Sequence, residues 1–218
     1  MKQFYTIVYC LLATIYCCHA QLPVSKEPRH HNVFENAWVR VLDVRIPPRD
    51  TSLFHRHEIP SVFLVLTKTK TGSQAIVEPA RPNLSSGNIW YESFEEKPRV
   101  HRVWNNDTSE FHAMDIELLR HAHGDTSPLP EMDHFTLLFD EAPVRAYRIM
   151  VDAHTNLHLT KRATPVLIIK LTDEGSEVNV NGKLYKKRGD FSFIDADQSI
   201  DLNYKGAGRV PLAFFELK

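Results

Sequence analysis

Three histidines in the first half of the chain are spaced as metal ligands often are. His55 and His57 are separated only by Arg56 and precede the apolar run SVFLVL, and His101 belongs to a second strand-like run, RVHRVW. Side chains two positions apart on a β-strand point to the same side, so the imidazoles of His55 and His57 can converge on one ion. Neutral imidazole is the commonest protein ligand for transition metals. We therefore predict a metal site formed by His55, His57 and His101.

A carboxylate ligand is not expected in this set. Glu58 directly follows His57 and alternates to the opposite face of the strand. Three imidazoles with open coordination positions suit one divalent transition metal, which could be Fe(II), zinc, nickel, manganese or copper. The alternative interpretation is that the three histidines are polar residues lining an empty barrel.

Arg99 is a candidate for binding the acid group of a small molecule. It shares a strand face with His101, so its guanidinium could enter the interior and hold a carboxylate. In the alternative, Arg99 lies at the barrel mouth and pairs with Glu95 or Glu96.

Four further residues are candidates for the pocket. Ser61 and Phe63 share one strand face, and Phe63 is expected in the pocket wall. Tyr91 and His112 could donate a proton or orient a ligand, with a core or surface position as the alternative. Asn105, four residues after His101, is expected to close a turn through its backbone hydrogen bonds.

A second group of possible ligands lies in a Pro-rich stretch. Without strands to fix their geometry, these residues are expected to form a solvated loop rather than a metal site. They are His121, His123, Asp125, Asp133 and His134.

The chain contains an internal repeat. Residues 34–67 align without a gap to residues 139–172: FENAWVRVLDVRI returns as FDEAPVRAYRIMV, and PSVFLVLT returns as PVLIIKLT. In the second copy Thr160, Arg162 and Ser199 are expected at the places of the three histidines. The second copy is therefore predicted to lack a metal site, to cover the sheet of the first, and to contribute to a homodimer interface.

Short β-branched and aromatic runs separated by turn residues fill both copies, and no convincing amphipathic helix competes with them. We predict an all-β fold of two tandem antiparallel sandwich or barrel domains. The expected divisions are an N-terminal arm over 21–32, a first domain over 33–120, a linker over 121–133 and a second domain over 134–218.

The first twenty residues are typical of a secretory signal peptide. Lys2 precedes the apolar run IVYCLLATIY, and Cys18-His19-Ala20 provides small residues before a polar stretch. The run is shorter than the roughly 20 residues that span a bilayer. Cleavage after Ala20 would remove all three cysteines, so we expect a cysteine-free protein that is secreted or periplasmic. A balanced formal net charge of −1 argues against nucleic acid or an anionic membrane as a partner.

The segments IPPRDTSLFHRHEIPSVFLVL and PRVHRVWN resemble the two motifs of the cupin family. The duplication resembles its two-domain members, the bicupins, with a degenerate second domain. One departure is Ser61, which stands where the family usually has a glutamate as fourth ligand, and the glycine of the second motif is absent. The resemblance implies jelly-roll barrels and a metal bound by His55, His57 and His101.

The resemblance also implies candidate functions. Cupins with three-histidine sites include dioxygenases, which favours Fe(II) and a small aromatic or carboxylated substrate. The alternatives are a non-catalytic protein that binds a metal or small ligand, and a metal-assisted isomerase or lyase. Fold alone does not choose among them.

Overall fold

The computed structural model describes residues 21–76, 78–82, 87–120, 133–175 and 177–218. The predicted signal peptide and nearly all of the predicted linker lie outside these residues. Within them the chain is built from β-strands, apart from one short 3-10 helix, η1 (Val24–Lys26). The all-β prediction is confirmed. No helix among the described residues is long and apolar enough to cross a membrane.

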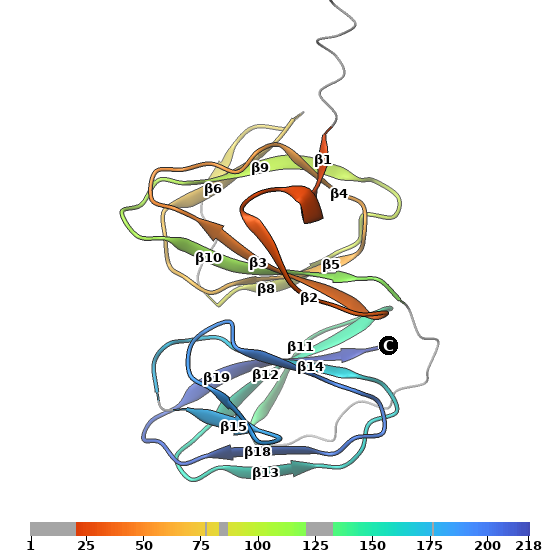
Figure 1. Cartoon of the computed structure of the whole chain (residues 1–218), viewed down its shortest axis with the longest axis vertical. Helices are drawn as coiled ribbons and strands as arrows, with labels where there is room; N and C mark the ends of the chain where they lie inside the picture. Colours follow the sequence, from red (N-terminus) through yellow and green to blue (C-terminus); the bar gives the residue numbers. More distant parts are fainter. Residues whose placement is uncertain (1–20, 77, 83–86, 121–132, 176) are drawn as a thin grey trace, which may run out of the picture.

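The first half of the chain forms two five-stranded sheets that enclose a barrel (Figure 1). The outer sheet has the order β1-β4-β9-β6-β7, with β1 (Leu22–Pro23), β4 (His55–His57), β9 (Arg99–Asn105), β6 (Thr71–Ala75) and β7 (Arg81–Pro82). The inner sheet has the order β2-β3-β10-β5-β8, with β2 (His30–Glu35), β3 (Val39–Ile46), β10 (Phe111–Leu118), β5 (Ser61–Val65) and β8 (Ile89–Glu92).

The second half repeats this arrangement. Its inner sheet has the order β11-β12-β19-β14-β17, with β11 (Phe135–Glu141), β12 (Val144–Val151), β19 (Val210–Leu217), β14 (Val166–Lys170) and β17 (Phe191–Ile194). Its outer sheet has the order β13-β18-β15-β16, with β13 (Asn156–Leu159), β18 (Ile200–Tyr204), β15 (Val178–Val180) and β16 (Lys183–Tyr185).

The internal repeat of the sequence is therefore a repeat of topology. Even an irregularity is repeated, because the edge strands β2 and β11 shift register at Asn32/Phe34 and Leu137/Phe139 respectively. A bulge of this kind bends an edge strand and breaks the regular row of its backbone N–H and C=O groups. This makes it harder for another sheet to pair with the edge.

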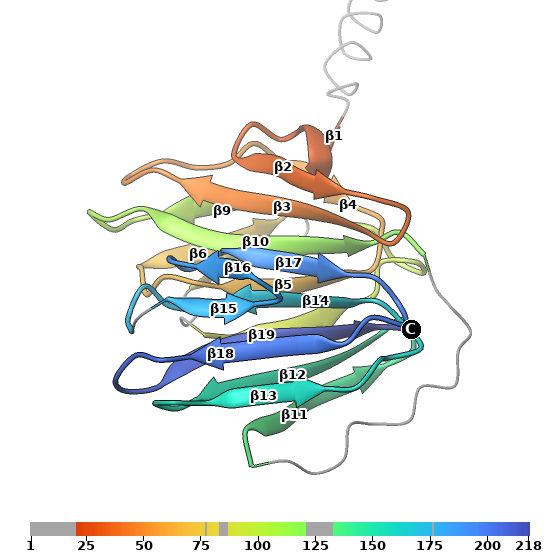
Figure 2. The ribbon, with the colours of Figure 1, turned by 60° about the horizontal axis from the view of Figure 1, so that its bottom comes forward.

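The two inner sheets pack face to face in the middle of the molecule, as Figures 1 and 2 show. One apolar cluster joins them, with residues such as Val62 and Ile116 from the first half and Leu167 and Phe215 from the second. These four side chains are at most 1 % exposed. Because this shared layer is an apolar core, each half buries one face of the other.

Residues 21–32 are not a separate arm, contrary to the sequence-based expectation. Leu22 and Pro23 pair in parallel with His55 and Arg56 at the edge of the outer sheet. Buried Glu27 accepts hydrogen bonds from the backbone N–H groups of Arg29 (2.7 Å) and Leu53 (3.0 Å). The segment is thus part of the first barrel and closes one side of it.

Candidate metal centre

Strand pairing places the three predicted ligands together. In the antiparallel ladder of β4 and β9, His55 lies opposite His101, and His57 lies opposite Arg99. His55 and His57 are 0 % and 1 % exposed. One ring nitrogen from each of the three histidines lies within 4.8 Å of the others, and this is the only group of ligand residues with that geometry among the described parts of the chain.

The ring nitrogens of this cluster fit a shared metal ion. Nε2 of His57 and Nε2 of His101 lie 3.0 Å apart. Two imidazole nitrogens bound to one ion at about 2.0–2.1 Å are separated by roughly 3 Å, so this spacing is suitable. The Nδ1–H of His55 donates to the carbonyl of Leu53 (2.9 Å), which leaves its buried Nε2 without a protein partner. A buried ring nitrogen of this kind can act as a ligand to a metal ion.

The environment keeps these imidazoles neutral. Burial, followed by the charge of His30, lowers the pKa of His55 from 6.5 to about 4. Burial also lowers the pKa of His57 and of His101 well below the ordinary value, in each case with a further contribution from the neighbouring histidines. Since only a neutral imidazole can bind a metal, the site is ready for an ion at neutral pH.

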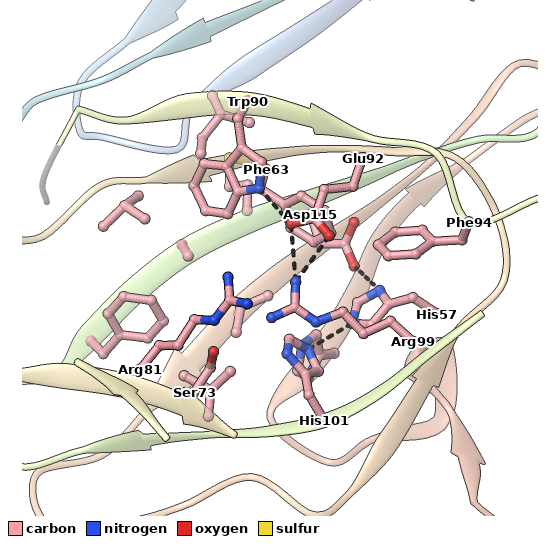
Figure 3. A pocket seen from close by; sticks show the side chains of 18 residues that line it. His57, Phe63, Ser73, Arg81, Trp90, Glu92, Phe94, Arg99, His101 and Asp115 are labelled. Atoms are coloured by element: carbon pink, nitrogen blue, oxygen red, sulfur yellow. Dashed lines mark hydrogen bonds and ion pairs between the residues drawn. The ribbon is translucent and has the colours of Figure 1, made fainter. Parts of the chain in front are cut away.

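A cavity of about 280 Å³ adjoins the histidines inside the first barrel (Figure 3). Phe63 stacks on Trp90, with 5.2 Å between ring centroids, and Phe94 stacks on His57 at 5.2 Å. These aromatic rings form an apolar wall, and the guanidinium groups of Arg81 and Arg99 extend into the space from the outer sheet. The cavity therefore combines a flat apolar surface with cationic groups.

Arg99 is already paired. Its guanidinium donates to both carboxylate oxygens of Glu92, at 3.1 and 2.9 Å, and Glu92 also accepts from the indole N–H of Trp90 (2.8 Å). The sequence-based alternative placed Glu95 or Glu96 in that role, and the structure assigns it to Glu92. Arg99 does face the cavity, as the shared strand face with His101 predicted.

Three pocket candidates lie elsewhere, which corrects the expectation that they line it. Buried Ser61 donates to the carbonyl of Ile59 (3.0 Å). Tyr91 lies opposite Val62 and packs against the core between the two halves. His112 forms a hydrogen bond with Asp43 (2.6 Å). Tyr91 has the opposite strand parity from Trp90 and Glu92 of β8, and His112 has the opposite parity from Phe111, Ala113 and Asp115 of β10, so both point away from these cavity-lining residues.

Several cavity residues were missed from the sequence. Asp115 lies on β10, 3.5 Å from Nδ1 of His57, and Trp90 and Glu92 lie on β8. His30 also lines the cavity, and its ring lies 4.5 Å from that of His55 with its Nδ1 bound to Glu27 (2.6 Å). An available signal was the acidic pair in the apolar run FHAMDIELL, because Asp115 shares the parity of the inward-facing Phe111.

The pKa values of the two acidic groups beside the site are shifted in opposite directions. Burial, and secondarily the charge of Glu117, raises the pKa of Asp115 well above its ordinary range. Burial also tends to raise the pKa of Glu27, but hydrogen bonds from His30 and from the backbone of Leu53 outweigh it, so the pKa falls below 4.5. Glu27 is therefore a stable anion whose hydrogen bonds hold the ring of His30 and the backbone of Leu53, just before β4.

No corresponding site occurs among the residues of the second barrel that the structure describes. Its interior is filled by apolar side chains, and Leu159 lies opposite Ile200 in the ladder of β13 and β18. The inward-facing positions of β13 and β18 differ by one residue from those that the sequence alignment predicted. Thr160 is exposed and Ser199 is only half-buried, so neither occupies the interior. Arg162 instead pairs with buried Glu216 (2.6 Å).

The second histidine group is not a site in the described part of the chain. His121, His123 and Asp125 lie outside the described residues. Asp133 is exposed, and His134 donates from Nδ1 to the carbonyl of Met150 (3.1 Å).

Asn105 closes a turn, as predicted. Its fully buried side-chain amide donates to the carbonyls of Ile46 (3.0 Å), Pro47 (3.2 Å) and Ser109 (2.8 Å). The Asn105 side-chain oxygen accepts from the N–H of Asp107 (3.0 Å). Asn105 thus connects the end of β9 to two loops and does not face the metal position.

No family model matches the chain, and no curated protein matches it. Solved structures do match. The YhhW protein from Escherichia coli is 13% identical, with a TM-score of 0.60 over 88% of this chain and 89% of that one. The chain has the two-barrel cupin fold.

Two other matches have similar statistics. Salicylate 1,2-dioxygenase from Pseudaminobacter salicylatoxidans is 13% identical, with a TM-score of 0.61 over 95% of this chain and 81% of that one. AerE from Microcystis aeruginosa is 10% identical, with a TM-score of 0.57 over 88% of this chain and 98% of that one. At these identities the likeness establishes the cupin fold, and activity has to be argued from the site.

Proposed function

We propose that this cupin is an exported metal-dependent oxygenase that acts on a small aromatic or carboxylated molecule, with Fe(II) as the favoured metal. The observation that carries the proposal is the convergence of His55, His57 and His101 beside a cavity with an aromatic wall. A structure of YhhW holds nickel(II), and one of the salicylate dioxygenase holds gentisate. These two structures match 86% and 95% of this chain, respectively.

The three histidines would hold the ion, and the ion would supply a Lewis-acid and redox centre with open positions. The cavity would bind the organic molecule. A flat ring fits against the stacked pair of Phe63 and Trp90, and an acid group would approach Arg81 and Arg99. Phe94 covers His57 and limits the access of water.

The size of the cavity restricts the substrate. About 280 Å³ is at the lower end of the range for small-molecule pockets, which suits a molecule with a single ring. An outer groove shares Arg81, Glu92, Phe94 and Arg99 with the cavity and would provide the route of entry.

Oxygen consumption tests this function. The protein would be loaded anaerobically with one equivalent of Fe(II) and exposed to oxygen with a panel of phenols, hydroxybenzoates, diketones and thiols. Uptake is expected with at least one compound and should vanish in the His55→Ala/His57→Ala variant. His158→Ala is the matched control, because His158 is exposed in the second barrel. A stoichiometrically loaded protein that consumes no oxygen with any compound would refute the oxygenase.

A non-catalytic ligand-binding protein is the second candidate. It is favoured by the ion pair between Arg99 and Glu92, which neutralises the cation that a substrate acid would need. Native mass spectrometry of the purified protein distinguishes the two, since a binding protein is expected to retain a stoichiometric organic ligand unchanged in air.

Export is part of the proposal. It is supported by Lys2, the following apolar run and Ala20, and by the first strand beginning at Leu22. Amino-terminal sequencing of the protein from its native host is expected to begin at Gln21. A mature chain that begins at Met1 would remove this part of the proposal and leave the oxygenase unaffected.

A further inference from the structure

Asp115 is an acid buried without a hydrogen bond. It is 1 % exposed, and neither of its carboxylate oxygens has a hydrogen-bond partner. The neighbouring hydroxyl of Ser61 lowers the pKa of this carboxyl, but the hydrogen bond that it donates goes to the carbonyl of Ile59 (3.0 Å). An acid that is buried and unpaired lowers the stability of the fold, so its presence calls for a compensating role.

The position of Asp115 points to that role. Its Oδ2 lies 3.5 Å from Nδ1 of His57, while Nε2 of the same ring lies 3.0 Å from Nε2 of His101. The imidazole of His57 therefore lies between the carboxyl of Asp115 and the ring of His101 (Figure 3), and His101 is one of the three histidines that converge. Metal-binding histidines commonly donate their second N–H to a carboxylate, which fixes both the tautomer and the ring orientation.

The internal repeat supplies a second observation. Asp115 lies between Leu42 and Phe63 in the inner sheet of the first half. The residue with the same two-sided position in the second half is Phe214, between Tyr147 and Ile168. At this position of the inner sheet, the first half, which has the three histidines, carries Asp115. The second half, which lacks them, carries the apolar side chain of Phe214.

We propose that Asp115 is the positioning residue of the metal centre: its carboxyl oxygen Oδ2 accepts the Nδ1–H of His57 and so presents Nε2 to the ion. This inference rests on the proposed metal site and adds to it a residue that does not itself contact the metal. If Asp115 has this role, metal binding should shorten the distance between Asp115 Oδ2 and His57 Nδ1 from 3.5 Å to that of a strong hydrogen bond.

The test uses Co²⁺ alone as the probe and the affinity measured by competition with a chromophoric chelator. Asp115→Leu removes the acceptor, and Asp115→Asn keeps a neutral acceptor of the same size. Glu117→Gln is the matched control, because Glu117 is buried on the same face of β10 but pairs with Arg40 (2.6 Å) rather than with the site. Urea unfolding of each metal-free variant shows that it folds.

Asp115→Leu is expected to weaken Co²⁺ binding roughly 10–100-fold while the metal-free protein becomes no less stable than the wild type. Asp115→Asn should lie between the two, and Glu117→Gln should bind Co²⁺ as the wild type does. The ¹⁵N spectrum of His57 should change from one tautomer to a mixture in Asp115→Leu. A merely structural acid would give the reverse pattern, with stability lost and affinity kept.

The outcomes separate this inference from the proposed function. Unchanged Co²⁺ affinity and an unchanged His57 tautomer in both Asp115 variants would overturn the inference alone, provided that His55→Ala/His57→Ala abolishes binding. If the wild type itself binds no Co²⁺, both proposals fall. If Asp115→Leu does not fold, Asp115→Asn decides through the same affinity and tautomer measurements.

Discussion

His55 should make the metal-free protein sensitive to acid. Its imidazole is fully buried, with a pKa lowered from 6.5 to about 4, so the folded state resists a proton that the unfolded chain accepts. Stability is then fully present above pH 6.5 and is lost as the pH falls from 6.5 toward 4. The shift corresponds to about 3 kcal/mol at pH 4 for this residue alone. His57 and His101 act in the same direction.

The perturbation that isolates this contribution is His55→Gln, whose amide can still donate to the carbonyl of Leu53 but does not titrate in this range. Urea unfolding of the metal-free proteins at pH 7 and pH 4 gives the loss of stability on acidification. The variant should lose about 3 kcal/mol less than the wild type. His158→Gln is the control, and its loss should equal that of the wild type, since the His158 side chain is 62% exposed.

Equal losses for the wild type and His55→Gln would refute the reasoning. Such a result would mean that His55 accepts a proton in the folded state as easily as in the unfolded chain. The ring would then have to reach water, and the buried site of neutral imidazoles would not exist as described.

Four further predictions concern the metal, the second barrel and the connections around the site. Zinc at 100 times its Kd should stabilise the wild type by about 2.7 kcal/mol and raise its Tm by roughly 5–10 °C, and a similar rise in His55→Ala/His57→Ala would contradict the site. Phe214→Ala should lower the free energy of unfolding by about 3–5 kcal/mol, because this ring is fully buried in the filled barrel; a change below about 1 kcal/mol would show that the barrel is loosely packed. Asn105→Ala should cost about 1–3 kcal/mol in urea unfolding, since three carbonyls lose their donor, and a neutral result would mean that water replaces it. Glu27→Ala should speed hydrogen exchange at the amide of Leu53 at least tenfold, because this amide donates to Glu27. Unchanged exchange would show that Glu27 does not hold the N-terminal segment against the first barrel.

The sequence alone determined the repeat, the all-β class and the shared strand face of His55 and His57. These features depend on local rules: alternation along a strand puts His55 and His57 on one face, and the repeated hydrophobic pattern specifies the same sheets twice. The role of Asn105 was equally local, because an Asn at a strand end bonds nearby backbone.

Tertiary structure decided which residues surround the ligands. Asp115 lies beside His57, and Glu92 forms an ion pair with Arg99, because separate strands pair in a register that no single stretch of sequence encodes. A one-residue error of phase reverses the direction of a side chain, which is why Trp90 lines the cavity and Tyr91 does not, and why Leu159 rather than Thr160 fills the second barrel. The alternation of a strand depends on its own residues, whereas the strands that pair with it depend on the packing of the whole sheet.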